Sequence, residues 1–309
     1  MAKGKKTLKK LLIALPLLIA FILISNLCDK GILPWQIQKP IDTLNDATDG
    51  LIYPKQSNTK ALSVHYIDVG QGDSILICCE GKNMIIDGGI PQETSTVENY
   101  LEDHAIKHLD YVIGTHPHDD HIGGLSGVID KYGIGNVILP DVTTNTKSFE
   151  RLLNSISKKK LDIIKAKAGN TYSLGGAKFT ILAPLEKYND LNNMSVVIRL
   201  TYKKNSFLFT GDASSESEND MLSANENLAA DVLKVGHHGS STATTKKFLD
   251  AVHPSYAVIS VGKDNSYGLP DSEIIQRIQN SGIKLLRTDN NGTVVIYSDG
   301  QNITYKKER

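Results

Sequence analysis

Residues 115–124 read Thr-His-Pro-His-Asp-Asp-His-Ile-Gly-Gly and directly follow the strand-like run 109–114. This stretch contains four candidate metal ligands within six residues: His116, His118, Asp120 and His121. Imidazole and carboxylate groups at this density suit divalent transition metals, and four ligands in one loop can serve two ions. The Gly-Gly pair that follows is expected to let the backbone turn tightly into a helix. The stretch therefore predicts a metal centre between a strand and a helix.

Polar residues also follow several other strand-like runs. Three apolar runs each stop at a glycine and a polar side chain: 84–86 at Asp87, 206–210 at Asp212, and 232–235 at His237 and His238. Short apolar runs stopped by glycine are typical of buried strands. Because ligand clefts form at strand ends in α/β proteins, we expect these side chains at the rim of a sheet. Asp-Gly is also a common turn pair, so Asp87 taken alone is equally consistent with a structural turn.

The pattern of apolar runs predicts two stacked sheets with helices outside. We expect strands at 62–69, 73–79, 82–86, 109–115, 137–139, 178–182, 196–202, 206–210, 231–235, 256–261, 283–287 and 293–297. We expect helices at 94–106, 124–132, 147–158, 215–224, 244–252 and 272–280.

With these motifs in place, the chain resembles the metallo-β-lactamase-fold hydrolases, and within them the ComEC/Rec2-related branch of competence proteins. Six motifs carry the resemblance in the family order, at 65–74, 86–89, 115–124, 193–197, 209–212 and 233–240. The resemblance covers residues 62–298. It implies an α+β fold, specifically an αββα sandwich of two mixed β-sheets flanked by helices.

The resemblance also implies a role for each candidate side chain. His116 and His118 would bind one ion, Asp120 and His121 the second, with Asp212 bridging both. One of His237 and His238 would complete the second site, and the other would face the substrate. Asp87 would orient the ligand histidines, which need an acceptor on their other nitrogen. Asp120, Asp87 and His237 are the predicted catalytic residues.

One motif departs from the wider superfamily, in which many members have a metal-binding histidine near position 193. Here the sequence is Asn192-Asn193-Met194-Ser195. Asn193 or water would then take that place, as in the competence-protein branch. Asn193, Ser195, Ser240 and Ser241 are the predicted substrate-binding residues, although serines at 240 and 241 are equally typical of a cap before a helix.

Charge and cysteine content bear on two classes of protein, general nucleic-acid binders and disulfide-rich exported proteins. Lys plus Arg and Asp plus Glu number 34 each, so the net charge is zero. Most general nucleic-acid binders are basic, so bulk charge does not support DNA binding. The basic stretch 158–167 is typical of the solvated end of a helix. The three cysteines include the neighbours Cys78 and Cys79, whose side chains would point to opposite faces of a strand, so no disulfide framework is expected.

Residues 1–28 have the form of a signal or membrane anchor. Five lysines precede the uncharged stretch 11–27, which is just long enough to cross a bilayer. The lysines predict a cytoplasmic N-terminus with the domain outside. We favour a retained anchor in the cell membrane over cleavage and secretion, because no small-x-small site precedes Cys28. Residues 29–60 are expected to form a linker, and 61–306 the hydrolase domain.

The predicted function is metal-dependent hydrolysis of a phosphodiester outside the cytoplasm, with DNA as the substrate that the resemblance implies. Two divalent ions would lower the pKa of a shared water and provide hydroxide near neutral pH. Zinc is the expected metal, and manganese and iron are alternatives. The rival hypotheses are hydrolysis of another exported ester, such as phosphocholine on a cell-wall polymer, hydrolysis of a lactam, and a non-catalytic metal-binding scaffold or DNA-receptor module. No protein partner is inferred.

Overall fold

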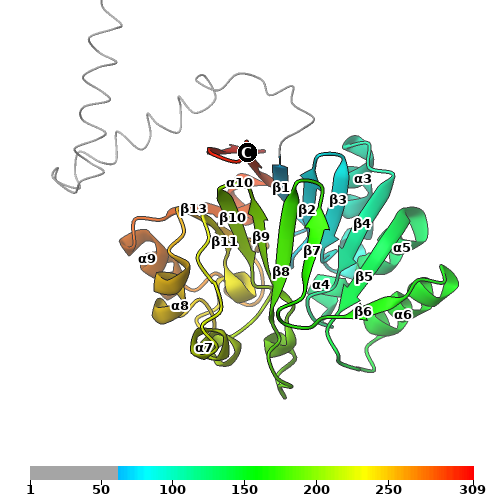
Figure 1. Cartoon of the computed structure of the whole chain (residues 1–309), viewed down its shortest axis with the longest axis horizontal. Helices are drawn as coiled ribbons and strands as arrows, with labels where there is room; N and C mark the ends of the chain where they lie inside the picture. The colour runs from blue at the N-terminus through cyan, green and yellow to red at the C-terminus, as the bar shows by residue number, and fades with distance from the viewer. Residues whose placement is uncertain (1–61) are drawn as a thin grey trace, which may run out of the picture. The chain divides into compact units, whose positions relative to one another are not determined.

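Two β-sheets, each covered by helices on its outer face, make up residues 62–309, the part of the chain that this computed structural model describes (Figure 1). The first sheet has the order β15 (Ile303–Lys307), β14 (Val294–Ser298), β1 (Leu62–Tyr66), β2 (Ile75–Cys79), β3 (Lys82–Ile86), β4 (His108–Ile113), β5 (Gly133–Leu139) and β6 (Ile163–Lys165). Its strands are antiparallel from β15 to β3 and parallel from β3 to β6.

The second sheet is also mixed. Its order is β13 (Lys284–Arg287), β12 (Tyr256–Ile259), β11 (Val232–Lys234), β10 (Asn205–Phe209), β9 (Val197–Tyr202), β8 (Ala177–Ala183) and β7 (Thr171–Leu174). The strands from β13 to β10 are parallel, and those from β10 to β7 are antiparallel. The predicted αββα sandwich of two mixed sheets is therefore confirmed.

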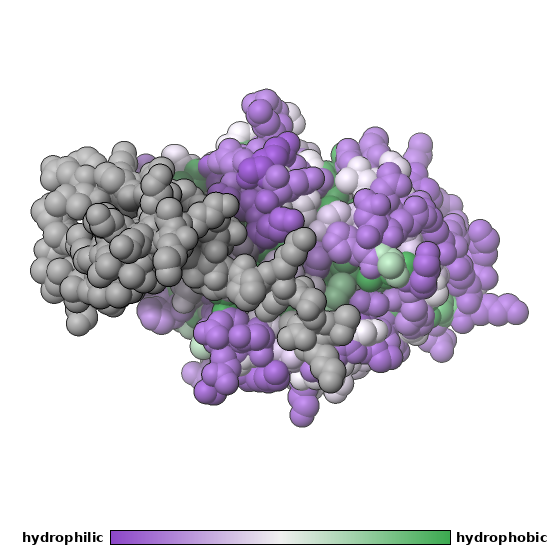
Figure 2. All heavy atoms as spheres, turned by 90° about the horizontal axis from the view of Figure 1, so that it is seen from above, coloured by the Kyte–Doolittle hydropathy of each residue, from purple (hydrophilic) through white to green (hydrophobic). Residues whose placement is uncertain are grey.

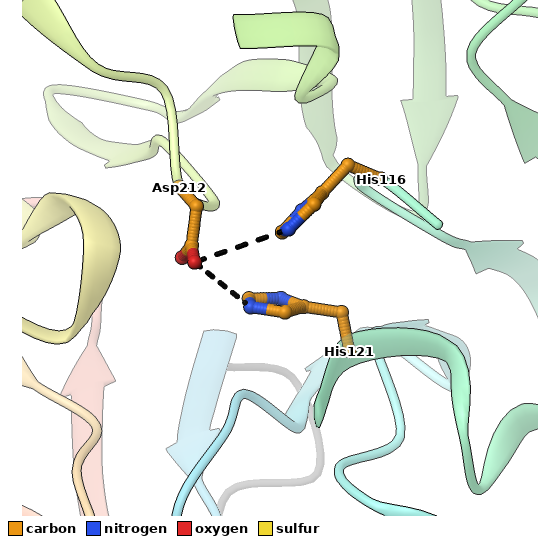
Figure 3. Close-up of side chains that lie close together, drawn as sticks. All are labelled: His116, His121 and Asp212. Carbon is orange, nitrogen blue, oxygen red and sulfur yellow. Dashed lines mark ion pairs between the residues drawn. The ribbon is translucent and has the colours of Figure 1, made fainter. Parts of the chain in front are cut away.

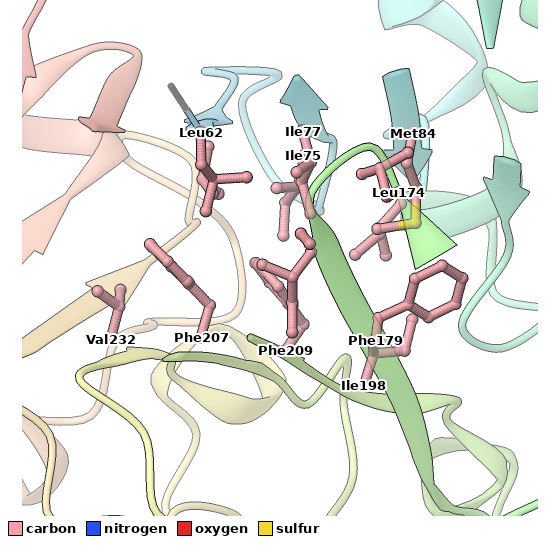
Figure 4. Packing of buried hydrophobic residues seen from close by; sticks show 14 of the residues in the cluster. Leu62, Ile75, Ile77, Met84, Leu174, Phe179, Ile198, Phe207, Phe209 and Val232 are labelled. Atoms are coloured by element: carbon pink, nitrogen blue, oxygen red, sulfur yellow. The ribbon is translucent and has the colours of Figure 1, made fainter. Parts of the chain in front are cut away.

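The central core lies between the two sheets. Alternate side chains of each strand point into this layer, where Phe209 of β10 lies opposite Ile75 of β2 and Phe207 lies opposite Leu62 of β1 (Figure 4). Every residue of β10 is buried, because its other face is covered by helices. The two sheets are thus held together by apolar packing, which fixes the distance between their strand ends.

Helices cover the outer faces of both sheets. The first sheet is covered by α3 (Thr94–Asp103), α5 (Leu125–Lys131) and α6 (Lys147–Lys158), and the second by α7 (Ser215–Ser223), α8 (Lys246–Val252) and α9 (Ser272–Asn280). The helix α6 illustrates why these segments are helical: Phe149, Leu152 and Ile156 recur on one face, and Thr146 caps the first turn by accepting from the Phe149 N–H.

Short helical turns complete the fold. They are η1 (Pro91–Glu93), α4 (Asp119–Ile122), η2 (Leu191–Met194), η3 (Gly236–Gly239) and α10 (Thr288–Asn291). The surface view shows a face on which hydrophilic side chains predominate and hydrophobic ones appear in small areas between them (Figure 2).

Three strands of the structure have no counterpart in the sequence prediction: β6, β7 and β15. All three lie at sheet edges, and Leu174 is the only buried residue among them. They therefore lack the apolar alternation by which a strand is recognised. Within residues 62–309, no helix combines the length and apolar character needed to cross a bilayer. The predicted anchor at 1–28 and linker at 29–60 lie outside the described residues.

Candidate metal centre

Strand ends from both sheets bring the candidate ligands together. Asp87 follows β3 and His116 follows β4, while Asp212 follows β10 and the pair His237–His238 follows β11. Within each sheet the two strands concerned run parallel, so their carboxyl ends share one edge. A hydrogen bond from the Val196 N–H to the Thr115 carbonyl, 2.9 Å long, joins the two edges.

The His-x-His-x-Asp-His stretch forms a single tight turn. His118 is the N-cap residue of α4, and its carbonyl accepts from the His121 N–H at 3.1 Å. The Gly-Gly pair is needed for close packing rather than for a left-handed turn. A Cβ on Gly123 would lie 2.4 Å from Pro91 Cδ, and one on Gly124 would lie 2.2 Å from the Gly88 carbonyl oxygen. This packing explains why the loop tolerates no side chain there.

Asp212 lies at the middle of the cluster. Its Oδ2 is 3.3 Å from His121 Nε2 and 3.9 Å from His116 Nε2 (Figure 3). The same oxygen is 3.4 Å from His238 Nε2 and 3.8 Å from His237 Nε2. One carboxylate oxygen is therefore surrounded by four imidazole nitrogens, the geometry expected of a bridging ligand.

Two groups of donor atoms can be distinguished around Asp212. In the first, His116 Nε2 and His118 Nδ1 lie 3.0 Å apart. In the second, Asp120 Oδ2 is 3.3 Å from His238 Nε2, and His121 Nε2 is 3.2 Å from His238 Nε2. His116 and His118 thus form one pair and Asp120, His121 and His238 a second group, and the two meet where the rings of His116 and His121 lie 4.1 Å apart, centroid to centroid.

The two adjacent histidines, which the sequence left interchangeable, differ in placement. His238 is 2% exposed, and its Nδ1 lies 2.9 Å from the Ser260 carbonyl, which leaves Nε2 directed at the cluster. The side chain of His237 is 26% exposed, and its Nδ1 lies 2.9 Å from Thr242 Oγ1. The geometry favours His238 as the ligand and places His237 at the mouth of the site.

Asp87 supports the cluster from behind. Its Oδ2 is 2.8 Å from His121 Nδ1, and its two oxygens accept hydrogen bonds from the N–H and the hydroxyl of Thr115. The buried carboxylate thus fixes the imidazole so that Nε2 of His121 faces Asp212. Its backbone has a φ of 58°, in the left-handed region that aspartate adopts more readily than most residues.

A buried ion pair beside the cluster was not predicted from the sequence. Lys234 Nζ lies 2.8 Å from Asp73 Oδ2, and the two side chains are 0% and 2% exposed. Asp73 Oδ1 is 3.6 Å from His238 Nδ1, and the Asp73 N–H donates to the Asp120 carbonyl. A lysine inside the apolar strand β11 was the available signal, because lysine is almost never fully buried without a partner.

The predicted substrate-binding residues occupy different positions. Asn193 is buried, and its amide accepts from the Ser214 N–H and donates to Glu216, so it holds the loop after Asp212. Ser195 is also buried, with Oγ accepting from the Asp212 N–H and lying 3.3 Å from His116 Nδ1.

Ser240 and Ser241 lie nearer the surface. The hydroxyl of Ser240 is 3.0 Å from Thr242 Oγ1, and the Ser241 N–H donates to Asp271. The helix that follows is capped by Thr245 instead, which accepts from the Phe248 N–H.

The carboxylates of the cluster favour positive charge on the histidines beside them. Burial opposes protonation of His121 and His238, yet neighbouring carboxylates led by Asp212 raise the pKa of His121 well above its ordinary value and that of His238 to about 10. Despite its own burial, Asp212 has a pKa well below the usual range because His121 and His238 lie beside it. Burial and His121 lower the pKa of His116.

This donor set fits divalent cations. Asp212 Oδ1 is buried and has no hydrogen-bond partner among residues 62–309, which is costly unless a ligand satisfies it. Imidazole nitrogens that converge on carboxylates match the preferences of zinc and manganese. In the described part of the chain, three groups of His and carboxylate side chains have ligand atoms within 4.8 Å of one another, and His121 belongs to all three.

Comparisons with known proteins agree with this geometry. Residues 67–263 match the model of the metallo-beta-lactamase superfamily. In three dimensions, the metallo-beta-lactamase fold protein YhfI from Bacillus subtilis superimposes with a TM-score of 0.52 at 13% identity, covering 77% of this chain and all of that one. The chain therefore belongs to the metallo-beta-lactamase superfamily.

Within that superfamily, the chain is similar to competence proteins. ComE operon protein 3 of Bacillus subtilis is 31% identical over 262 residues, which are 79% of this chain and 34% of that protein. Competence protein ComA of Neisseria gonorrhoeae is 30% identical over 230 residues, 74% of this chain and 31% of that protein. The chain thus spans about a third of the length of these relatives.

Proposed function

We propose that this chain is a metal-dependent phosphodiesterase that cleaves DNA outside the cytoplasm. The observation that carries the proposal is the convergence of four imidazoles on Asp212, whose second oxygen is buried without a partner. A non-catalytic scaffold would need to bind metal but would not need a substrate to reach it. Here Asp120 and His237 keep 27% and 26% of their side chains exposed, which leaves an approach for a substrate.

Two divalent ions are proposed as the cofactors. His116, His118 and Asp212 would hold the first, and Asp120, His121, His238 and Asp212 the second. Such a pair lowers the pKa of water and compensates negative charge at an attacked phosphorus. Zinc suits these ligands, and manganese is the alternative.

The protein's own groups keep this arrangement rigid. Asp87 and the Ser260 carbonyl each engage the Nδ1 of a ligand histidine, so both imidazoles present Nε2 to the centre. Asn193 and Ser195 fasten the backbone around Asp212. His237, held through Thr242 at the mouth, is placed to contact the substrate.

The competence relatives support DNA as the substrate, and the predicted N-terminal anchor supports a location outside the cytoplasm. The net charge of zero argues against broad electrostatic binding. We therefore expect a short bound segment with few phosphate contacts and a weak dependence of affinity on salt.

The test uses the full chain in mild detergent, loaded with zinc or manganese. Bound metal is measured by elemental analysis, and cleavage is measured on bis-p-nitrophenyl phosphate and on single- and double-stranded DNA. Asp212→Asn should lose both metal and cleavage, with metal affinity reduced by at least the 10- to 100-fold typical of ligand-supporting residues. The matched control, Asp250→Asn, alters an exposed aspartate paired with Lys246 and should retain both.

The outcomes separate the rival functions. DNA cleavage that disappears in Asp212→Asn supports the nuclease. Turnover of the small diester without DNA cleavage would contradict DNA as the substrate and favour a small exported ester. Metal binding without cleavage of any ester would contradict the enzyme and favour a scaffold.

A further inference from the structure

The loop 262–270 is anchored to the metal centre at both ends. It begins two residues after Ser260, whose carbonyl engages His238, and the Gly262 N–H donates to the side chain of Gln71. At its other end, a Cβ on Gly239 would lie 2.5 Å from Pro270 Cβ, so Pro270 packs directly on the residue after His238. The Asp271 N–H also donates to the Gly239 carbonyl at 2.9 Å. The loop therefore borders the second group of ligands.

Asn265 makes this loop rigid from within. Its Nδ2 donates to the carbonyls of Gly262 and Leu269, at 2.9 and 2.6 Å. Its Oδ1 accepts from the N–H groups of Tyr267 and Leu269, both at 3.1 Å. One side chain thus ties both arms of the loop together and fixes the backbone at Tyr267 before any ligand binds. Such preorganisation reduces the entropy lost on binding.

Tyr267 is the most exposed large hydrophobic residue in the described part of the chain. Its exposed fraction is 71%, and Ile163 is the other such residue, at 40%. Tyr267 lies three residues from Pro270, so its Cα is within about 11 Å of that of Pro270. The loop that borders the second group of ligands therefore presents an aromatic ring to solvent.

The loop has no net charge with which to attract the phosphates of a nucleic acid, so base stacking on Tyr267 is the interaction it can offer. Lys263 and Asp264 are both exposed and of opposite sign, so the loop adds no net charge. An exposed aromatic ring on such a loop offers its flat face to a planar partner. Nucleobases supply that partner in single strands, where they are unstacked and can lie on aromatic side chains.

We propose that Tyr267 is a substrate-recognition residue that stacks on a base of a single-stranded nucleic acid held at the metal centre. The inference rests on the proposed nuclease function and adds to it a preference for single strands over duplex. Stacking of this kind tolerates any base, so little sequence preference is expected. Loss of the ring should raise KM for a single strand by roughly 5- to 150-fold, with kcat retained.

The test compares two substrates of equal length with the full, metal-loaded chain. One is a single-stranded oligonucleotide, and the other has the same phosphodiester backbone with abasic sites throughout. Tyr267→Ala should raise KM for the first substrate and leave KM for the second unchanged, and Tyr267→Trp should retain the wild-type values. Ile163→Ala, which removes the other exposed apolar side chain, is the matched control and should change neither.

The possible results are distinct. An unchanged KM in Tyr267→Ala, or an equal rise for the abasic substrate, overturns base stacking while leaving the nuclease function intact. If the wild-type protein cleaves neither oligonucleotide, the proposed nuclease function fails and the inference fails with it. Metal content and thermal unfolding, measured on every variant, should equal those of the wild type if Tyr267 acts only on the substrate.

Discussion

The buried pair of Lys234 and Asp73 gives a quantitative test of how the centre is supported. The two charges are 2.8 Å apart, and their side chains are 0% and 2% exposed. Lys234→Met keeps a long apolar chain but leaves the Asp73 carboxylate buried without its partner. Breaking a buried pair in this way costs about 3–5 kcal/mol. Lys234 is therefore expected to matter for stability although it is not itself a candidate metal ligand.

The expected loss is large enough to measure by thermal unfolding. For domains of roughly 150–250 residues, each kcal/mol shifts Tm by about 2–4 °C. Lys234→Met should then lower Tm by about 6–20 °C. The measurement is circular dichroism on the full chain in the presence of a chelator, so that changes in metal binding do not contribute.

Two further variants identify the cause. The double variant Lys234→Met/Asp73→Asn removes both charges and should recover at least half of the loss. Lys82→Met breaks an exposed pair with Asp110 of the same length and should cost no more than about 1 kcal/mol. A Tm for Lys234→Met within about 2 °C of the wild type would refute the reasoning, as would a double variant no more stable than the single one.

Two other predictions concern acid stability and the loop beside Asp120. Burial and the nearby His104 lower the pKa of His65 to about 3. As the pH falls below about 6.5, His65 is therefore protonated in the unfolded chain but stays neutral in the folded chain. Stability should therefore be full above pH 6.5 and fall by up to about 5 kcal/mol as the pH drops toward 3. Urea unfolding at pH 7 and 4 measures this slope, and His65→Gln should flatten it; an equal slope would exclude His65 as its cause. Gly72→Ala would place a Cβ 2.2 Å from the Asp120 carbonyl oxygen and should lower bound metal, whereas Gly70→Ala on the same loop meets nothing within 4 Å. Equal metal content in the two variants would contradict the predicted clash.

The sequence alone determined the parts of this protein that local pattern encodes. The helices α6 and α9 and the strand β3 have the predicted bounds, because amphipathic periodicity and clear terminal residues mark them. The His-x-His-x-Asp-His stretch predicted a metal centre for a similar reason: dense ligand side chains within one turn have few structural uses, and the structure brings His116 and His121 of this stretch to Asp212.

Only the tertiary structure decided which distant residues meet. His237 and His238 are chemically identical in the sequence, and the carbonyl of Ser260, which directly follows β12, orients His238 to face Asp212. The buried partner of Lys234 lies on a loop of the other sheet. Such choices depend on how the two sheets pack, and packing is a long-range property that no local periodicity contains.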